Sequence, residues 1–397
     1  MSKIMILGAS ILQLPAIKKA KELGLEVVVV DMNPEAVGFN EDGIIKEVIS
    51  TIDVPAVVEA AKRNGIDGVM TLASDMPMRS VAAVAKELGL VGITDETALK
   101  ATNKAEMRKA LFEYGVPVPK FFKVSNKDEY NEAVKSFNVP FIVKPADNSG
   151  SRGIVKIENL SDKKSIDEAY AYSRASSRNG DVVVEEYMNG PEVSVETLTT
   201  DGECHIIQIT DKMTTGSPHF VETGHSQPTM LPYETVEKIK QITKDANKAV
   251  GITNGPSHTE IIVTEDGPKI VELGARLGGD CITTHLVPFS TGIDMVECCI
   301  KIALGEKPDI EKKFEKGSAI RYFRQKAGVV KSIEGVENAE RSKGVKHVSV
   351  VHGVGEKVTD IVDSASRMGF VIAQDINAEE AKKDCENALE KISVCIE

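Results

Sequence analysis

The sequence contains no tryptophan in its 397 residues, and aromatic residues make up only 5% of it. Long apolar runs are also missing. The run Ile4-Met5-Ile6-Leu7 stops at Gly8, and no other stretch reaches the roughly 18 apolar residues that a membrane span needs. We therefore expect no secretion signal and no membrane partner, and the low aromatic content gives no strong cue for a stacking site.

A basic surface and a cysteine framework are missing as well. The formal net charge is -12, from 60 acidic residues against 48 Lys and Arg, which argues against nucleic acid as a partner. The six cysteines show no Cys-x-x-Cys spacing, so neither a zinc site nor a disulfide framework is predicted. This cysteine usage favours a cytoplasmic location.

The first hundred residues alternate short β-branched runs with stretches of helical periodicity, which predicts a βαβαβ unit with a parallel sheet. Gly8-Ala9-Ser10 follows the first run, as in dinucleotide-binding proteins. That fingerprint needs two further glycines in the same turn, where this sequence has Leu12 and Gln13. NAD binding is therefore disfavoured.

A lysine before a small-residue loop is the first sign of phosphate chemistry. Lys144 stands alone in the apolar run Pro140–Pro145, and the loop Asp147-Asn148-Ser149-Gly150-Ser151-Arg152-Gly153 follows. Such a loop offers backbone N–H groups to phosphate oxygens, and the lysine adds a point charge. The loop lacks the Walker Gly-Lys-Ser, so a surface hairpin is the alternative interpretation.

Two strand-like segments could line a nucleotide base. The apolar run from Val182 turns polar at Glu185-Glu186-Tyr187-Met188, and a second strand with alternating polarity begins near Glu192. This segment could present backbone groups and one apolar side chain to an adenine ring.

Residues 258–280 carry the most information. Glu260 opens one apolar run, Asp266-Gly267 forms a turn, and Glu272 closes the next run, which predicts a β-hairpin. Two carboxylates on neighbouring strands could hold a hard cation. Arg276, four residues after Glu272, could face an anion bound to that cation. The glycines of Gly274-Ala275-Arg276-Leu277-Gly278-Gly279-Asp280 indicate a backbone that approaches a ligand closely.

These motifs, in this order along nearly the whole chain, resemble the ATP-grasp superfamily. The resemblance implies an α/β and α+β architecture: a Rossmann-like pre-grasp domain at residues 1–95, a two-lobed grasp core at 96–310 with its small lobe at about 121–188, and a small C-terminal α+β domain at 311–397. The charge-rich segment 311–317 marks the last junction. The resemblance also allows a homodimer.

The resemblance implies a role for each matching residue. Lys104 and Lys144 would contact ATP phosphates, the loop containing Ser149, Gly150, Ser151 and Gly153 would fold over them, Glu185, Glu186 and Met188 would line adenine, and Glu192 would hold the ribose. Glu260 and Glu272 would coordinate Mg²⁺, with Mn²⁺ as an alternative, and Arg276 would meet the acyl-phosphate or its carboxylate precursor. Many members carry Asn where this sequence has Gly274, so water or Asp280 would replace that ligand.

Within the superfamily, the segment 218–228 and the closing Arg276–Asp280 resemble carboxylate–amine ligases, especially bacterial L-amino-acid ligases. Glu222 and His225 would then face an incoming amine, together with Gly278 and Gly279, while Lys144 and Arg276 would offset charge during phosphoryl transfer. His258, beside Glu260, is a secondary substrate candidate. The expected partners are a small carboxylate and a small amine.

Two other function classes stay open at this point. One is a carboxylating or formyl-transferring grasp enzyme of the purine-biosynthesis or biotin-carboxylase type. The other is a nucleotide-binding protein without catalysis, although both metal acids are present.

Overall fold

The N-terminal unit is a parallel sheet between helices. A computed structural model describes residues 1–148, 152–217 and 220–397. Its first sheet has the order β3-β2-β1-β4 with parallel pairing throughout, which confirms the predicted βαβ unit. The elements are β1 (Lys3–Leu7), α1 (Leu14–Glu22), β2 (Glu26–Asp31), η1 (Val37–Asn40), β3 (Ile45–Val48), α2 (Val54–Asn64), β4 (Gly68–Met70) and α3 (Met78–Leu88).

The core of this unit follows from its apolar runs. Ile4 to Leu7 and Val28 to Val30 are completely buried, because helices cover both faces of a parallel sheet. The edge strand β3 escaped prediction. Its sequence Ile-Lys-Glu-Val is short and half polar, so its apolar pattern is too weak to identify a strand.

Two helices lead into the central region and meet at Asn103. α4 (Asp95–Thr102) ends at Asn103, and α5 (Lys104–Glu113) begins there. The Asn103 side chain accepts hydrogen bonds from the amides of Ala105 and Glu106 and so caps α5. This cap fixes Lys104 at the first turn of α5, with its side chain buried.

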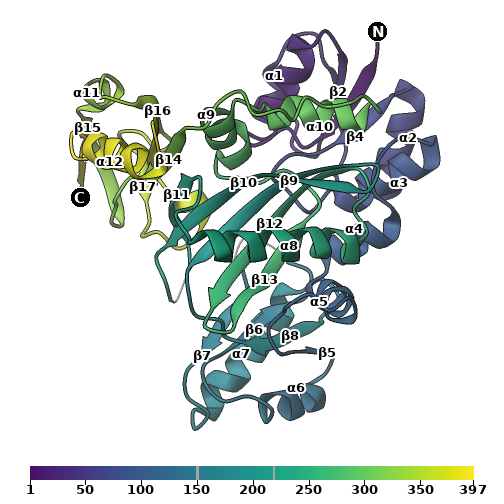
Figure 1. Ribbon diagram of the computed structural model, residues 1–397, viewed down its shortest axis with the longest axis vertical. Coiled ribbons are helices and arrows are strands. Elements are labelled where there is room, and N and C mark those ends of the chain that lie inside the picture. The colour runs from purple at the N-terminus through teal and green to yellow at the C-terminus, as the bar shows by residue number, and fades with distance from the viewer. Residues whose placement is uncertain (149–151, 218–219) are drawn as a thin grey trace.

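A small lobe stands apart at the bottom of Figure 1. Its antiparallel sheet has the order β5-β8-β6-β7, and α6 and α7 pack against this sheet. Phe137, Phe141 and Tyr130 fill the core between them. The elements are β5 (Phe121–Val124), α6 (Lys127–Val134), β6 (Phe141–Pro145), β7 (Val155–Ile157), α7 (Lys163–Ser176) and β8 (Val182–Glu186).

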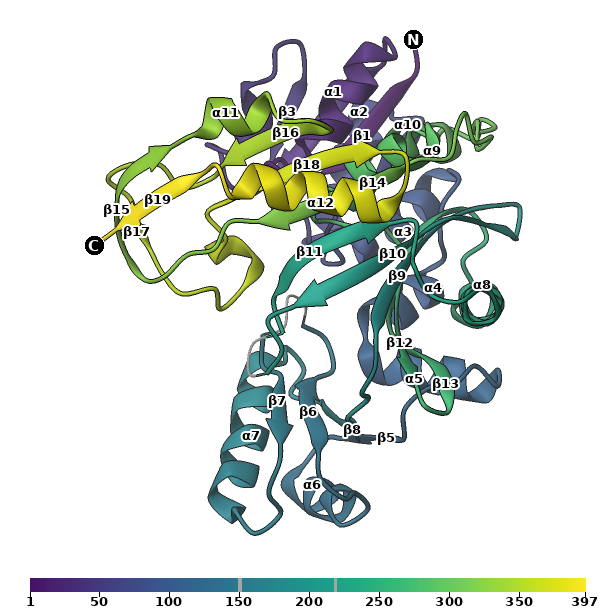
Figure 2. The ribbon, with the colours of Figure 1, turned by 60° about the vertical axis from the view of Figure 1, so that its left-hand side comes forward.

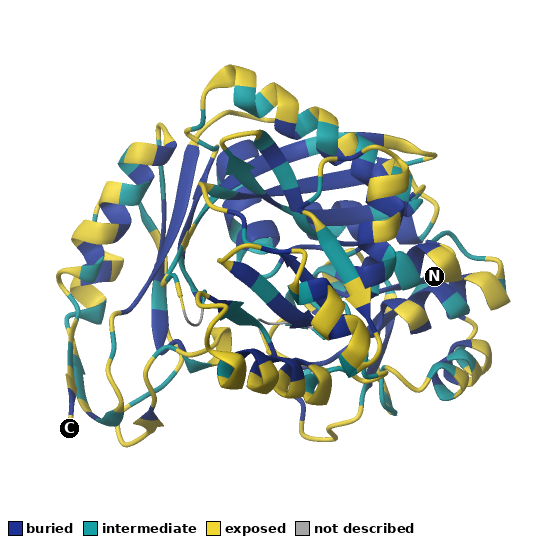
Figure 3. Ribbon diagram, turned by 90° about the horizontal axis from the view of Figure 1, so that it is seen from below, coloured by how far each residue is buried: buried dark blue, intermediate teal, exposed yellow. Residues whose placement is uncertain are grey.

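The large sheet runs through the middle of the molecule, in the order β13-β12-β9-β10-β11-β14-β18-β16. The helix α8 packs against β10, β12 and β13 (Figure 2). Figure 3 shows the strands of this sheet largely buried and the outer helix faces exposed. The elements of this part of the chain are β9 (Glu192–Thr200), β10 (Glu203–Thr214), β11 (Glu222–Gln227), α8 (Tyr233–Val250), β12 (Gly255–Thr264), β13 (Gly267–Gly274), η2 (Ile282–Leu286), α9 (Val287–Thr291) and α10 (Met295–Ala303).

The C-terminal residues extend this sheet. β14 pairs with β11, and β18 and β16 follow outward, so the sheet continues across the predicted junction at 311–317. The resemblance implied a small α+β domain here but not the place of its strands beside β11. The elements are β14 (Gly317–Tyr322), β15 (Gly328–Glu334), α11 (Val336–Glu340), β16 (Val345–Val350), β17 (Lys357–Val358), η3 (Ser364–Ser366), β18 (Gly369–Asp375), α12 (Ala378–Leu389) and β19 (Ser393–Ile396).

None of the described helices is long and apolar enough to cross a membrane.

Candidate active site

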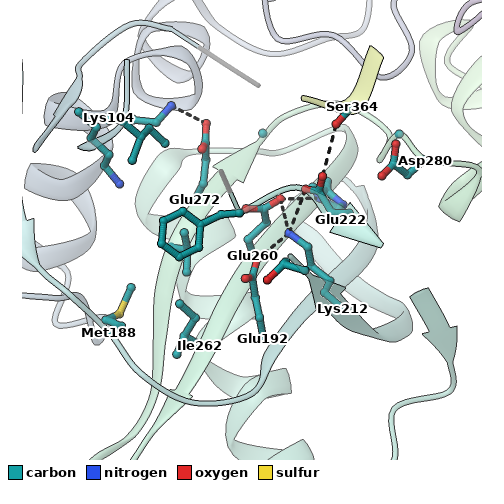
Figure 4. Close-up of a pocket in the computed structure, with 18 of the residues that line it drawn as sticks. Lys104, Met188, Glu192, Lys212, Glu222, Glu260, Ile262, Glu272, Asp280 and Ser364 are labelled. Carbon is teal, nitrogen blue, oxygen red and sulfur yellow. Dashed lines mark hydrogen bonds and ion pairs between the residues drawn. The ribbon is translucent and has the colours of Figure 1, made fainter. Parts of the chain in front are cut away.

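A cavity of about 650 Å³ opens where the parts of the chain meet. The N-terminal unit contributes Asp75, the small lobe Lys144, the large sheet Glu260, and the C-terminal region Ser364. Figure 4 shows acids, lysines and the apolar side chains of Met188 and Ile262 around one space. A volume of this size suits a small-molecule site.

The two predicted metal acids lie side by side. Glu260 on β12 and Glu272 on β13 are direct partners in the antiparallel ladder, which confirms the predicted hairpin. Each acid is paired with a lysine: Lys104 Nζ lies 2.9 Å from Glu272 Oε1, and Lys212 Nζ lies 3.0 Å from Glu260 Oε1 (Figure 4).

Lys212 is the main residue that the sequence analysis missed. It lies on β10 opposite Glu192, and its Nζ is 2.6 Å from Glu192 Oε1 and 3.7 Å from Glu222 Oε1. Burial lowers the pKa of Lys212, but Glu260, Glu192 and Glu222 outweigh burial and hold this pKa well above its usual value. The signal that found Lys144, a single lysine in an apolar run, is absent here, because Asp211 precedes Lys212 and Thr214 lies two residues after it.

Lys144 belongs to a buried charged triad. Its ammonium donates to Glu185, and Arg108 Nε donates to the other carboxylate oxygen of Glu185 at 3.0 Å. Burial raises the pKa of Glu185, but the two cations outweigh it and keep this carboxyl below its usual pKa. Both oxygens of the Glu185 carboxylate thus accept from cations of the chain. If Glu185 contacts adenine, as predicted, it does so through its backbone. Arg108 was not predicted as a site residue.

Arg276 reaches the cavity and is held by Asp75 of the N-terminal unit. Its Nε and one terminal nitrogen each lie 2.9 Å from an Asp75 oxygen, a bidentate geometry. A Cβ at Gly274 would stand 2.5 Å from Asp75 Oδ1. The departure from the commoner Asn therefore has a packing reason: this pair occupies the space of a side chain.

His258 is fixed between two carboxylates. Its Nδ1 lies 2.6 Å from Glu196 Oε1, and its Nε2 lies 3.4 Å from Glu260 Oε1. Burial lowers the pKa of His258, but Glu196 outweighs burial and raises this pKa to about 9. The imidazolium therefore positions Glu260, the predicted metal ligand.

The predicted amine end contains Glu222 and His225, which both line the cavity. His225 is buried, with Nε2 3.2 Å from Asp280 Oδ2. Arg367 binds both oxygens of Asp280 at 2.6 and 2.8 Å. Asp280 is therefore held by a guanidinium, and its role as the replacement metal ligand stays a prediction.

Most of the predicted site residues line this one cavity, and two do not. Gly278 packs behind it, where a Cβ would stand 2.7 Å from His258 Nδ1, and Gly153 packs on Ser176 of α7. The predicted loop residues Ser149, Gly150 and Ser151 lie outside the described residues. The cavity lining includes Lys104, Lys144, Glu185, Glu186, Met188, Glu192, Glu222, His225, His258, Glu260, Glu272, Arg276 and Gly279.

The donor set fits a hard divalent cation bound together with a nucleotide. In the described part of the chain, no three His, Cys, Asp or Glu side chains form a protein-only metal cage. Mg²⁺ commonly takes one or two carboxylates and completes its shell with phosphate oxygens and water. Glu260 and Glu272 would supply that pair, and either Mg²⁺ or Mn²⁺ accepts such oxygen ligands.

Comparisons with known proteins agree with this geometry. A model of the ATP-grasp domain matches residues 137–284, and one of L-amino acid ligase C-terminal domain 2 matches residues 321–397. The alanine–anticapsin ligase of Bacillus subtilis strain 168 is 27% identical over 278 residues, which cover 65% of this chain and 58% of that protein. The L-arginine-specific L-amino acid ligase of Bacillus subtilis is 26% identical over 290 residues, covering 72% of this chain and 69% of the relative.

Solved structures share the fold over the full length of the chain. L-amino acid ligase from Bacillus licheniformis has a TM-score of 0.86 at 23% identity and covers 100% of this chain and 99% of its own. Phosphoribosylglycinamide synthetase from Anaerococcus prevotii has a TM-score of 0.81 at 22% identity, with 100% of both chains covered. The resemblance inferred from the motifs is confirmed. The chain carries an ATP-grasp domain and, after it, C-terminal domain 2 of the L-amino acid ligases.

Proposed function

We propose that this protein is an ATP- and Mg²⁺-dependent ligase that activates a small carboxylate as an acyl-phosphate and joins it to the amine of an amino acid or another small amine. One observation carries the proposal. Within a single cavity, two ladder-paired carboxylates with lysine partners lie next to a further acid, Glu222, at the end reached by the C-terminal region.

The residues that line the cavity indicate where the nucleotide would bind. Met188 and Ile262 offer apolar contact to a base, and Glu192 offers a carboxylate to ribose hydroxyls (Figure 4). Lys104 and Lys144 supply positive charge for phosphates. Bound Mg²⁺ would be held by Glu260 and Glu272 and would screen the negative charge of the phosphate oxygens.

The first step joins two anions, so it needs cations. An oxygen of the substrate carboxylate bonds to the γ-phosphorus, the bond from that phosphorus to the β-phosphate oxygen breaks, and ADP leaves. Lys212 and Arg276 line the cavity and would offset the repulsion between the two anions. Lys212 becomes available as its carboxylate partners bind metal, ribose and amine.

The second step forms the amide. The amine nitrogen attacks the acyl carbon, the bond from carbon to the phosphate oxygen breaks, and inorganic phosphate leaves with the second proton of the amine. Glu222 is exposed to the cavity and suits an ammonium group, whose proton it can accept. His225 is buried behind Glu222, so we propose that it supports the structure of the amine-binding part of the cavity and does not contact the amine.

A coupled-turnover screen tests the proposal. Each amino acid is supplied with MgATP and hydroxylamine, a small nucleophile that traps acyl-phosphates as hydroxamates. We expect ADP and hydroxamate to form with a subset of the carboxylates, and dipeptide or amide to form when an amine replaces hydroxylamine. No turnover with any carboxylate would overturn the proposal.

The same screen distinguishes the proposed ligase from the second candidate function, a carboxylating or purine-type enzyme. The phosphoribosylglycinamide synthetase fold match and the carboxylating relatives of this superfamily motivate arms with bicarbonate, formate and phosphoribosylamine. Turnover confined to one of these arms would favour the carboxylating or purine-type alternative. We further propose a cytoplasmic location, which cell fractionation tests, and a homodimer, which sedimentation of the purified protein tests.

A further inference from the structure

The C-terminal region places one buried arginine at the amine end of the cavity. Arg367 follows η3, whose turn is closed by Asp363 and Ser366 in a reciprocal capping box. Its guanidinium carbon lies 3.8 Å from the centre of the Tyr322 ring, a stacked geometry. Figure 4 shows Ser364 and Asp280 from this neighbourhood close to Glu222.

The donors of Arg367 are shared among three separate segments. Its Nε donates to the Ser364 carbonyl at 3.0 Å, which ties the side chain to its own turn. Its two terminal nitrogens donate to Asp280 at 2.6 and 2.8 Å, and one of them also donates to the Glu222 carbonyl at 3.2 Å. One side chain therefore joins η3, the start of β11 and the turn after Arg276.

Asp280 needs such an anchor. It has a φ of 51° and the next residue, Cys281, has a φ of 61°, both in the left-handed region that residues with a Cβ seldom adopt. The bidentate contact with Arg367 holds this turn in place. Asp280 then accepts a hydrogen bond from His225 Nε2 at 3.2 Å, so the imidazole carries its hydrogen on Nε2.

Glu222 is held at its backbone and at its side chain. Its carbonyl accepts from Arg367, and its carboxylate accepts from Ser364 Oγ at 3.4 Å (Figure 4). Both contacts come from the same C-terminal turn. The acid that we assign to the amine is thus oriented by residues more than a hundred positions further along the chain.

We propose that Arg367 is a positioning residue for amine recognition, and that the C-terminal region completes the amine subsite through Arg367, Asp280 and Ser364. The inference rests on the proposed ligase function. Because Asp280 already neutralises Arg367, this end presents the Glu222 carboxylate and selects a protonated amine as the second substrate.

The experiment compares four forms of the full chain: wild type, Arg367→Met, the double variant Arg367→Met/Asp280→Asn, and Arg341→Met. Arg341 is an exposed arginine of the same region that pairs with Glu337, and it serves as the matched control. Each form is measured for KM of the amine, KM of ATP, hydroxamate formation with hydroxylamine, and melting temperature.

We expect Arg367→Met to raise the KM of the amine by about 10- to 100-fold, since small misplacements of binding groups have effects of this size. The KM of ATP and the rate of hydroxamate formation should change less than threefold, because hydroxylamine needs no ammonium site. The double variant should recover melting temperature, as no charge is left unpaired, yet keep the raised amine KM. Arg341→Met should match wild type.

Two results would overturn the inference. The first is a double variant that regains both melting temperature and a wild-type amine KM, which would make the pair purely structural. The second is an equal rise in the KM of amine and ATP. If Arg367→Met does not fold, the double variant alone decides. Failure of wild type to form any hydroxamate counts against the ligase proposal itself and is thus a distinguishable outcome.

Discussion

The ammonium group of Lys212 lies 3.0 Å from Oε1 of Glu260, so an acid suited to magnesium is already paired with a cation of the chain. Lys104 and Glu272 repeat the relationship at 2.9 Å on the neighbouring strand. Carboxylates packed this closely repel one another, and the lysines offset that repulsion. Arrival of metal and nucleotide would exchange these partners and release lysine charge toward the phosphates.

Replacing Lys212 tests this exchange. Lys212→Met removes the charge shared by Glu192, Glu222 and Glu260 and keeps most of the side-chain volume. We expect kcat to fall by about 10²- to 10³-fold, the usual loss when one charge-stabilising donor is removed. Lys240→Met is the control, since Lys240 is half exposed on α8 and pairs with Glu237 of the same helix. A kcat within threefold of wild type would contradict a role for Lys212 in transfer.

The effect of a proposed metal ligand on turnover can be separated from its effect on nucleotide affinity. Glu272→Gln keeps the shape of the side chain and removes its charge, so we expect turnover to fall by about 100-fold or more, because metal charge stabilisation is worth several kcal/mol. ATP binding measured by calorimetry without Mg²⁺ should be retained. Equal turnover in Glu272→Gln and wild type would leave this acid outside the metal site.

The glycine at 274 has a structural consequence that substitution can show. Gly274→Ala places a Cβ 2.5 Å from Asp75 Oδ1, so the pair between Asp75 and Arg276 must shift. We expect the free energy of unfolding to fall by about 1–3 kcal/mol, as in other overpacked sites. In an Asp75→Ala background the same substitution should cost almost nothing. An undiminished cost in that background would assign the glycine to another cause.

The buried triad of Arg108, Glu185 and Lys144 predicts a large stability effect. Glu185→Met leaves two buried cations without a counter-ion, and we expect the free energy of unfolding to fall by about 3–5 kcal/mol. Denaturant titration measures this change. Glu186→Gln is the neighbouring control, because Glu186 is partly exposed. Equal midpoints for both variants would argue against the triad as a stabilising unit.

Acid stability should report the pair formed by Asp280 and Arg367. Burial raises the pKa of Asp280, but Arg367 and His225 outweigh burial and depress this pKa below its unfolded value of about 3.9. A depressed carboxyl pKa adds stability above that value, and this stability is lost as the pH falls below about 4. Asp280→Asn should therefore lose less melting temperature than wild type between pH 6 and pH 3.5. A parallel fall in both would refute the assignment.

Periodicity and local turn chemistry were enough to predict several elements. The buried runs Ile4–Leu7 and Val27–Val30 predicted parallel strands, and Asp266-Gly267 between two apolar runs predicted the hairpin that sets Glu260 beside Glu272. The break at Asn103 and the edge strand β3 were missed. The first depends on one side-chain cap, and the second is too polar to show a strand pattern.

The sequence by itself determined the residue types and the local elements that carry the chemistry: a strand lysine before a small loop, two acids across a hairpin, and an arginine among glycines. These signals are local, because hydrogen-bonded turns and side-chain alternation depend on near neighbours. The tertiary structure alone decided their partners. Asp75 for Arg276, Lys212 for Glu260 and Arg367 for Asp280 come from distant segments, and only chain packing brings such charges within contact distance.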